Sequence, residues 1–155
     1  MASVIGIHGD NTGLILPSVI APVQTVIVPI LFGDEDENKA IRQRCEELRD
    51  RLEANGVDVK IDDSDKRPGW KYNQWEMKGV PSRVEIGPRD LEEDNCVVAT
   101  RFGEKTTQDV DDGVGAVQDA LYSVDERIEE RAEQYFDDNT VYTEDYDELC
   151  ETLED

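Results

Sequence analysis

The chain has 155 residues and a formal net charge of −22, because 38 Asp and Glu residues outnumber 16 Lys and Arg residues. Val, Ile, Leu and Phe still supply about a quarter of the chain, above the roughly 20 % below which a highly charged chain stays disordered, so we expect one folded domain. No apolar run approaches the roughly 18 residues of a membrane span and no signal-peptide pattern opens the chain, which predicts a cytoplasmic protein.

The first half of the chain predicts a strand, a helix and a second strand. Residues 1–22 show no stable period, so we expect an extended leading segment. Residues 23–30 are a near-continuous β-branched run, which is typical of a strand buried on both faces. Residues 38–54 place apolar side chains at spacings of three and four before Gly56, which predicts a helix. Residues 57–62 alternate as the second strand.

The second half predicts three more strands and a long helix. A short helix of about two turns is expected to end at Gly79. The strands are predicted at residues 80–87, 95–102 and 105–110. An apolar stripe at helical spacing predicts one helix over residues 113–136. Residues 137–155 are expected to form a polar link and a short helix with Tyr146, Leu149 and Leu153 on one side.

Acidic side chains are scattered over every predicted element and do not gather in one tail. This distribution leaves two explanations open: a surface that stays hydrated in concentrated salt, or a surface that binds a basic partner. We favour a halophilic cytosol, where the Debye length falls to about 3 Å and the repulsion between carboxylates is screened.

Residues 66–105 depart from this acidity, because they hold eight cations and seven anions. Aromatic side chains lie among them, at Trp70, Tyr72, Trp75 and Phe102. Cations beside aromatic rings are the combination that binds single-stranded RNA. An ordinary surface with tryptophans in the core is the alternative. We expect core packing for Trp75 in particular, because it lies on a different helical face from Tyr72.

The same segment resembles a known family. GWKYNQWEMKGVPSRVEIGPRDLE, residues 69–92, closely resembles the segment GWKxxxWExKGVPxRxEIGPRDxE of the anticodon-binding domain of prolyl-tRNA synthetases, in the form found in archaea and eukaryotes. HGDNTGLILPSVIAPVQTVIVPI before it and CVVATRFGEK after it extend the resemblance to about residues 5–135. The resemblance implies an α/β fold with a mixed five-stranded sheet flanked by three main helices, as in class IIa aminoacyl-tRNA synthetases.

The resemblance also implies how the chain is divided. Residues 1–22 would be the tail of a class II catalytic module, residues 23–136 the anticodon-binding domain, and residues 137–155 the start of a C-terminal extension. ATP, Mg²⁺ and proline would bind upstream of Met1, so we expect no catalytic residue, cofactor or metal in this fragment. Zinc ligands would belong to the missing extension, with Cys150 a stray thiol, and the parent enzyme is expected to be a homodimer.

The ligand implied by the resemblance is the anticodon of proline tRNA, with guanines at its second and third positions. The positions carried over are Tyr72, where an aromatic ring stacks on a base, Glu76, where a carboxylate faces a guanine, and the cationic positions Arg83, Arg89 and Lys105. Carboxylate oxygens suit the N1–H and N2–H donors of guanine, and guanidinium or ammonium groups suit its O6 and N7 or a phosphate. Further RNA contacts are expected from Lys71, Lys78 and Arg101.

Local geometry agrees with a single concave patch, since Tyr72 and Glu76 are four residues apart on a helix and Arg83 points to one strand face. Two other functions remain. A flavodoxin-like nucleotide-binding domain would need a Gly-rich or hydroxyl-rich loop after Ile30, which the sequence lacks. An acidic α/β domain that docks a basic protein would bind without regard to RNA sequence. We therefore interpret the chain as the tRNA-recognising part of a proline–tRNA ligase, whose partners are proline tRNA and the rest of the synthetase.

Overall fold

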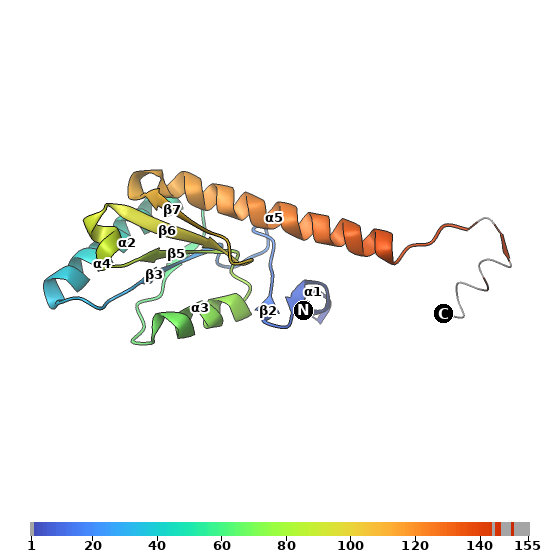
Figure 1. The fold of residues 1–155 in the computed structure, drawn as a ribbon, viewed down its shortest axis with the longest axis horizontal. Coiled ribbons are helices and arrows are strands. Elements are labelled where there is room, and N and C mark those ends of the chain that lie inside the picture. The colour runs from blue at the N-terminus through green and yellow to red at the C-terminus, as the bar shows by residue number, and fades with distance from the viewer. Residues whose placement is uncertain (1, 144, 147–149, 151–155) are drawn as a thin grey trace.

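The computed structural model describes residues 2–143, 145, 146 and 150. Its main sheet lies between α3 (Pro68–Met77) on one side and α5 (Gly113–Asp138) on the other (Figure 1). Of the side chains predicted to line one side of the last short helix, Leu149 and Leu153 fall outside the described residues, and Tyr146 is exposed.

The main sheet is mixed, which confirms the predicted fold class. Its strands are β3 (Thr25–Pro29), β4 (Val59–Ile61), β5 (Ser82–Ile86), β6 (Asn95–Thr100) and β7 (Lys105–Asp109). In the described chain they lie in the order β4-β3-β5-β6-β7. β3 is parallel to β4 and β5, whereas β6 is antiparallel to both of its neighbours. The remaining elements are α1 (Ala2–His8), β1 (Gly9–Asp10), β2 (Gly13–Leu14), α2 (Glu35–Ala54), α4 (Pro88–Glu92) and the 3₁₀ turn η1 (Val110–Asp112).

The two faces of the sheet carry different side chains. Residues paired across neighbouring strands share a face, so Ile27, Val84 and Val98 form one buried row. That row packs with the buried side chains of α2 and α5 in the main core. On the opposite face, Val26 and Val28 pack with Trp75 of α3 and with Val80, which lies three residues after the end of α3. This second cluster is smaller, because α3 covers only part of its face.

Helix α2 begins at Glu35, three residues before the predicted start, and its N-cap explains the difference. The side chain of Asp34 accepts a hydrogen bond from the backbone N–H of Glu37 at 2.9 Å. Three acidic side chains in the first turn stabilise the helix by interacting with the positive end of its dipole. Gly56, with φ of +79°, ends the helix as predicted.

The leading segment is not simply extended, because it contains α1 and the β1–β2 hairpin. A seven-residue helix and two-residue strands are too short for a periodic pattern to reveal. Helix α4 was also missed, although Pro88 at its first position and Asp90 three residues after Gly87 are usual start signals. The Asp90 carboxylate accepts the Gly87 N–H at 2.8 Å.

Helix α5 runs well beyond the sheet (Figure 1). Its first half buries Val117, Leu121 and Val124, whereas Phe136 in its last turn is 58 % exposed. The apolar stripe that predicted this helix therefore continues past the part that the core covers. No helix within the described ranges is long and apolar enough to cross a membrane.

Candidate nucleic-acid interface

The α3 side of the sheet is open over its last strands. Helix α3 packs on β3, while every residue of β7 is exposed. Arg83 on β5 pairs with Ala99 on β6, which pairs with Lys105 on β7, so these three side chains share the face on which α3 lies. Side chains beside α3 can therefore meet a large ligand on a flat, accessible surface.

Five side chains meet on this face, and we call them the polar cluster: Tyr72, Glu76, Arg83, Glu85 and Lys105. Arg83 lies at the centre, because its Nη1 donates to Glu76 Oε1 at 2.7 Å and its Nε donates to Glu85 Oε1 at 2.9 Å. Lys105 Nζ donates to both oxygens of Glu85, at 3.0 and 3.3 Å. The Arg83 guanidinium carbon lies 4.2 Å from the centre of the Tyr72 ring. Tyr72, Glu76 and Arg83 also line a shallow hollow between α3 and the strands.

Mutual contacts fix the charge states of the polar cluster. Burial alone would raise the pKa of Glu85, but hydrogen bonds from Arg83 and Lys105 outweigh it and hold that pKa below its usual value. Burial would lower the pKa of Arg83, but hydrogen bonds to Glu85 and Glu76 raise it. Burial, the Glu85 charge and a hydrogen bond to Glu85 raise the pKa of the Tyr72 phenol. At neutral pH Glu85 is therefore a carboxylate, Arg83 a cation and Tyr72 a protonated phenol.

Comparison with known proteins decides the family. A family model described as an anticodon-binding domain matches residues 20–120, which include α2, α3 and all five strands of the main sheet. This chain belongs to the anticodon-binding domain family.

Curated relatives of this anticodon-binding domain carry the name proline–tRNA ligase. That of Methanocorpusculum labreanum is 40 % identical over 155 residues, which cover 100 % of this chain and 32 % of the relative. That of Salinibacter ruber is 41 % identical over 148 residues, 94 % of this chain and 30 % of the relative. That of Methanothermobacter thermautotrophicus is 48 % identical over 133 residues, 85 % of this chain and 27 % of the relative. The chain thus spans about a third of the length of the curated relatives it matches.

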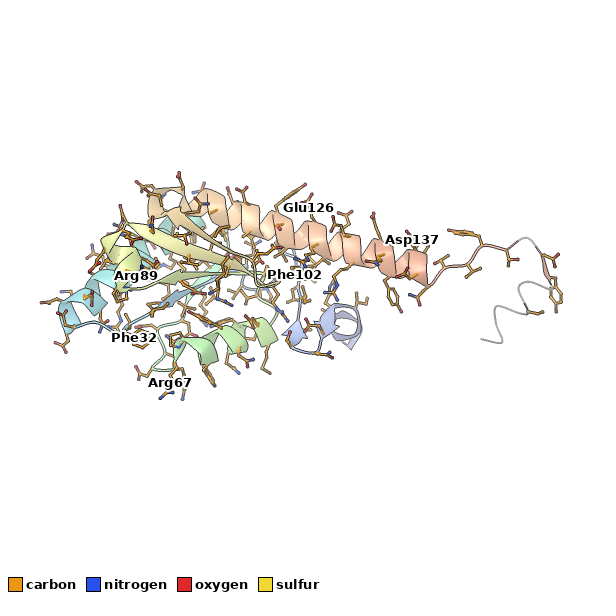
Figure 2. All side chains as sticks on the ribbon, in the orientation of Figure 1. Phe32, Arg67, Arg89, Phe102, Glu126 and Asp137 are labelled. Carbon is orange, nitrogen blue, oxygen red and sulfur yellow. The ribbon has the colours of Figure 1, made fainter. Side chains whose placement is uncertain are left out.

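The anticodon-binding domain brings together four of the five residues predicted as principal contacts: Tyr72, Glu76, Arg83 and Lys105. The fifth, Arg89, is exposed on α4, at the opposite end of the β5–β6 pair from Phe102 (Figure 2). Within the described part of the chain, Arg89 makes no hydrogen bond or ion pair with the polar cluster. Arg89 stays a predicted RNA contact, carried by α4 just after the end of β5.

Two of the three additional cations lie elsewhere in the domain. The side chain of Lys71 is buried, and its Nζ donates to the backbone oxygen of Asp62 at 2.8 Å. Lys78 is exposed at the end of α3, and its Nζ lies 4.2 Å from the centre of the Trp75 ring. Lys71 thus anchors the loop before α3, and Lys78 packs over the ring of Trp75.

Arg101 holds the leading segment to the sheet. Its side chain is only 6 % exposed, and its Nε donates to the backbone oxygen of Leu14 at 3.0 Å. Its Nη2 donates to Thr12 Oγ1 at 2.8 Å and lies 3.2 Å from Asp10 Oδ1. All three partners belong to the β1–β2 hairpin, so this guanidinium is committed to protein atoms.

Trp75 lies in the core, as predicted, and its Nε1 donates to Asp62 Oδ2 at 2.7 Å. The reason given for it was wrong, because Tyr72 and Trp75 both pack against the same cluster beneath α3. Trp70 is 49 % exposed, with Lys66 Nζ 5.7 Å from its ring centre. Glu85 was not among the site residues predicted from the sequence. Its position two residues after Arg83 on an alternating strand was the available signal.

Among the described residues, no group of three or more His, Cys, Asp and Glu side chains is placed to hold a metal ion. The hydrogen-bonding groups of the polar cluster instead suit a planar aromatic ligand that carries both donors and acceptors along one edge. A guanine base has such an edge, and its ring system can stack on the Tyr72 ring.

Proposed function

We propose that this chain recognises the anticodon of proline tRNA, as the anticodon-binding part of a prolyl-tRNA synthetase of the archaeal and eukaryotic type. Proline–tRNA ligase relatives match all or most of the chain. The observation that carries the proposal is the polar cluster on the open sheet face, where a carboxylate, a guanidinium and an aromatic ring adjoin. Aminoacylation with ATP and Mg²⁺, dimerisation and any zinc site belong to the remainder of the synthetase.

Glu76 is the group that meets the base first. Its side chain is 34 % exposed, whereas that of Arg83 is 12 % exposed. Arg83 Nη1 occupies Glu76 Oε1, so the carboxylate must share or release that bond to accept from both N1–H and N2–H of guanine. A base that offers no such pair of donors gains nothing in exchange for the lost ion pair. This exchange gives the site its preference for guanine.

Tyr72 supplies the stacking surface. The Arg83 guanidinium already lies against its ring at 4.2 Å, so one face of the ring is occupied. A base stacks either on the accessible side of the ring or on the guanidinium plane, since both kinds of surface stack on bases. Stacking of this kind adds affinity with little base preference. We therefore assign discrimination to Glu76 and Arg83 and general affinity to Tyr72.

We further infer a halophilic, cytoplasmic protein, because the charge of −22 falls outside a polar cluster that is itself neutral. Glu126 and Asp137 project from α5 on the side of the molecule away from α3 (Figure 2). In molar salt the attraction of phosphates contributes little, because counterion release loses its driving force. Short-range contacts to the bases then carry recognition.

The test is a set of dissociation constants, at fixed molar KCl, for a proline anticodon stem-loop and a stem-loop with its two guanines replaced. The unmodified chain is expected to prefer the first, with about 1 to 3 kcal/mol for each bidentate contact to a base. Glu76→Ala and Arg83→Ala are expected to remove that preference. Tyr72→Ala is expected to weaken both stem-loops equally, by about 1 to 3 kcal/mol.

Lys39→Ala is the control, since Lys39 is an exposed cation on α2, away from the polar cluster. It is expected to change neither dissociation constant. Equal binding of the two stem-loops by the unmodified chain would contradict the proposal and would favour an acidic domain that docks a basic partner.

A further inference from the structure

Glu85 forms ion pairs with two members of the polar cluster, Arg83 and Lys105. Its side chain is 9 % exposed, the least of the charged groups there. It accepts from Arg83 Nε at 2.9 Å and from Lys105 Nζ at 3.0 and 3.3 Å. These contacts use both of its oxygens and leave little room for a base to reach them. Glu85 is therefore placed to act through its neighbours and not on the ligand.

Arg83 is shared by two carboxylates of unequal exposure. Nη1 holds the accessible Glu76, and Nε holds the buried Glu85. When Glu76 turns to a guanine, Arg83 loses one of these partners and keeps the other. A buried carboxylate that binds Nε fixes the orientation of the guanidinium plane. The remaining N–H groups of Arg83 therefore stay directed at the open face of the sheet.

Lys105 and Tyr72 depend on the same carboxylate. Lys105 stands on the edge strand β7, whose side chains are exposed, and its ammonium would have many orientations without a buried partner. The ring of Tyr72 lies against the Arg83 guanidinium, which Glu85 holds at Nε, so Tyr72 depends on Glu85 through Arg83. One side chain thus orients the aromatic surface and both cations of the site.

We propose that Glu85 is a positioning residue for base discrimination, which holds Arg83, Lys105 and Tyr72 in their recognition geometry when Glu76 exchanges Arg83 for a guanine. This inference rests on the proposed recognition of the anticodon. It predicts that the specificity of the site requires a carboxylate that never touches the RNA.

The test is Glu85→Gln, which keeps the size of the side chain and removes its charge. At fixed molar KCl, the ratio of the two dissociation constants is expected to fall about tenfold, the equivalent of about 1.4 kcal/mol or one bidentate base contact. The melting temperature of each variant is measured alongside, so that discrimination is compared only among folded proteins. The exchange rate of the Arg83 Nε–H, followed by NMR, is expected to rise in Glu85→Gln, a change that a purely structural loss elsewhere would not cause.

Glu104→Gln is the matched control. It removes the same charge and an ion pair of similar length, 2.8 Å to Arg127, outside the polar cluster. It is expected to leave the ratio and the Arg83 exchange rate unchanged. Where Glu85→Gln does not fold, Glu85→Asp keeps the buried charge but withdraws the carboxylate from its partners, and the ratio is again expected to fall.

The outcomes separate the two claims. A wild-type chain that binds both stem-loops equally overturns the proposed function, and this inference falls with it. A wild-type chain that discriminates, together with a folded Glu85→Gln or Glu85→Asp that keeps the full ratio, overturns the role of Glu85 alone.

Discussion

Arg101→Met separates a structural role for this arginine from the RNA contact that its position in the sequence suggests. The Arg101 side chain is 6 % exposed, and its guanidinium binds the backbone oxygen of Leu14 and the side chains of Thr12 and Asp10. Methionine keeps the apolar stem of the side chain and removes its donors. The substitution therefore tests whether the attachment of the β1–β2 hairpin to the sheet contributes to stability.

The expected loss of stability depends on which hydrogen-bond partners of Arg101 can bind water instead once the guanidinium is removed. Asp10 is 28 % exposed at its side chain, so solvent compensates for much of its lost ion pair. The Leu14 carbonyl is only partly exposed, and a hydrogen bond from a charged donor to such a group is worth about 1.5 to 3 kcal/mol. We expect a loss of about 2 kcal/mol, which lowers the melting temperature of a domain of this size by about 6 °C.

Thermal unfolding followed by circular dichroism measures this loss, with Arg131→Met as the control. Arg131 is exposed on α5, and its replacement is expected to leave the melting temperature unchanged. Arg101→Met is expected to retain the ratio of dissociation constants for the two stem-loops at temperatures below its transition. An unchanged melting temperature together with lost RNA binding would refute this reasoning and make Arg101 an RNA contact.

Further predictions concern backbone strain, buried thiols and charge. Gly79→Ala should lower the free energy of unfolding in urea by about 2 to 4 kcal/mol, because its φ is +80° and an added Cβ would lie 2.7 Å from side-chain atoms at and just after β2. The control Gly103→Ala, with a φ of +88° and open space around the added Cβ, should lower it by only about 1 to 2 kcal/mol. Equal losses would contradict the packing of β2 on α3. Burial raises the pKa of Cys45 to about 12 and that of Cys96 to about 11. Iodoacetamide at neutral pH should therefore label only the exposed Cys150 in the folded protein. Comparable labelling of all three thiols would argue against the burial of Cys45 and Cys96 in the core. The melting temperature should rise between about 0.05 M and about 2 M KCl, as screening shortens the range of carboxylate repulsion; a flat response would contradict the halophilic inference without affecting RNA recognition.

The sequence predicted the five strands of the main sheet and its longer helices. The run at residues 23–30 contains β3, and the stripe over residues 113–136 follows α5 to within two residues of its end. The short helices α1 and α4 escaped, because each has fewer residues than two helical turns. Asp34 was readable as an N-cap, but apolar spacing placed the start of α2 at its first core residues and not at its cap.

The candidate site was predicted as a set of residues and not as a network. Resemblance supplied Tyr72, Glu76, Arg83 and Lys105, but no sequence pattern indicated that Arg83 binds two carboxylates at once. Glu85 was overlooked because a charged residue on a strand is normally read as solvent-facing. The inward turn of Lys71 and Arg101 depends on carbonyl groups in distant segments, at Asp62 and Leu14, which only the fold brings near.

The most direct test of anticodon recognition is a ¹H–¹⁵N chemical-shift titration of the chain at molar KCl. A proline anticodon stem-loop is expected to shift the resonances of α3, β5 and β7, with those of the exposed side of α5 unmoved. The stem-loop with replaced guanines is expected to leave α3, β5 and β7 largely unchanged at the same concentration. Equal shifts with both stem-loops, or shifts confined to the acidic surface of α5, would contradict guanine recognition at the polar cluster.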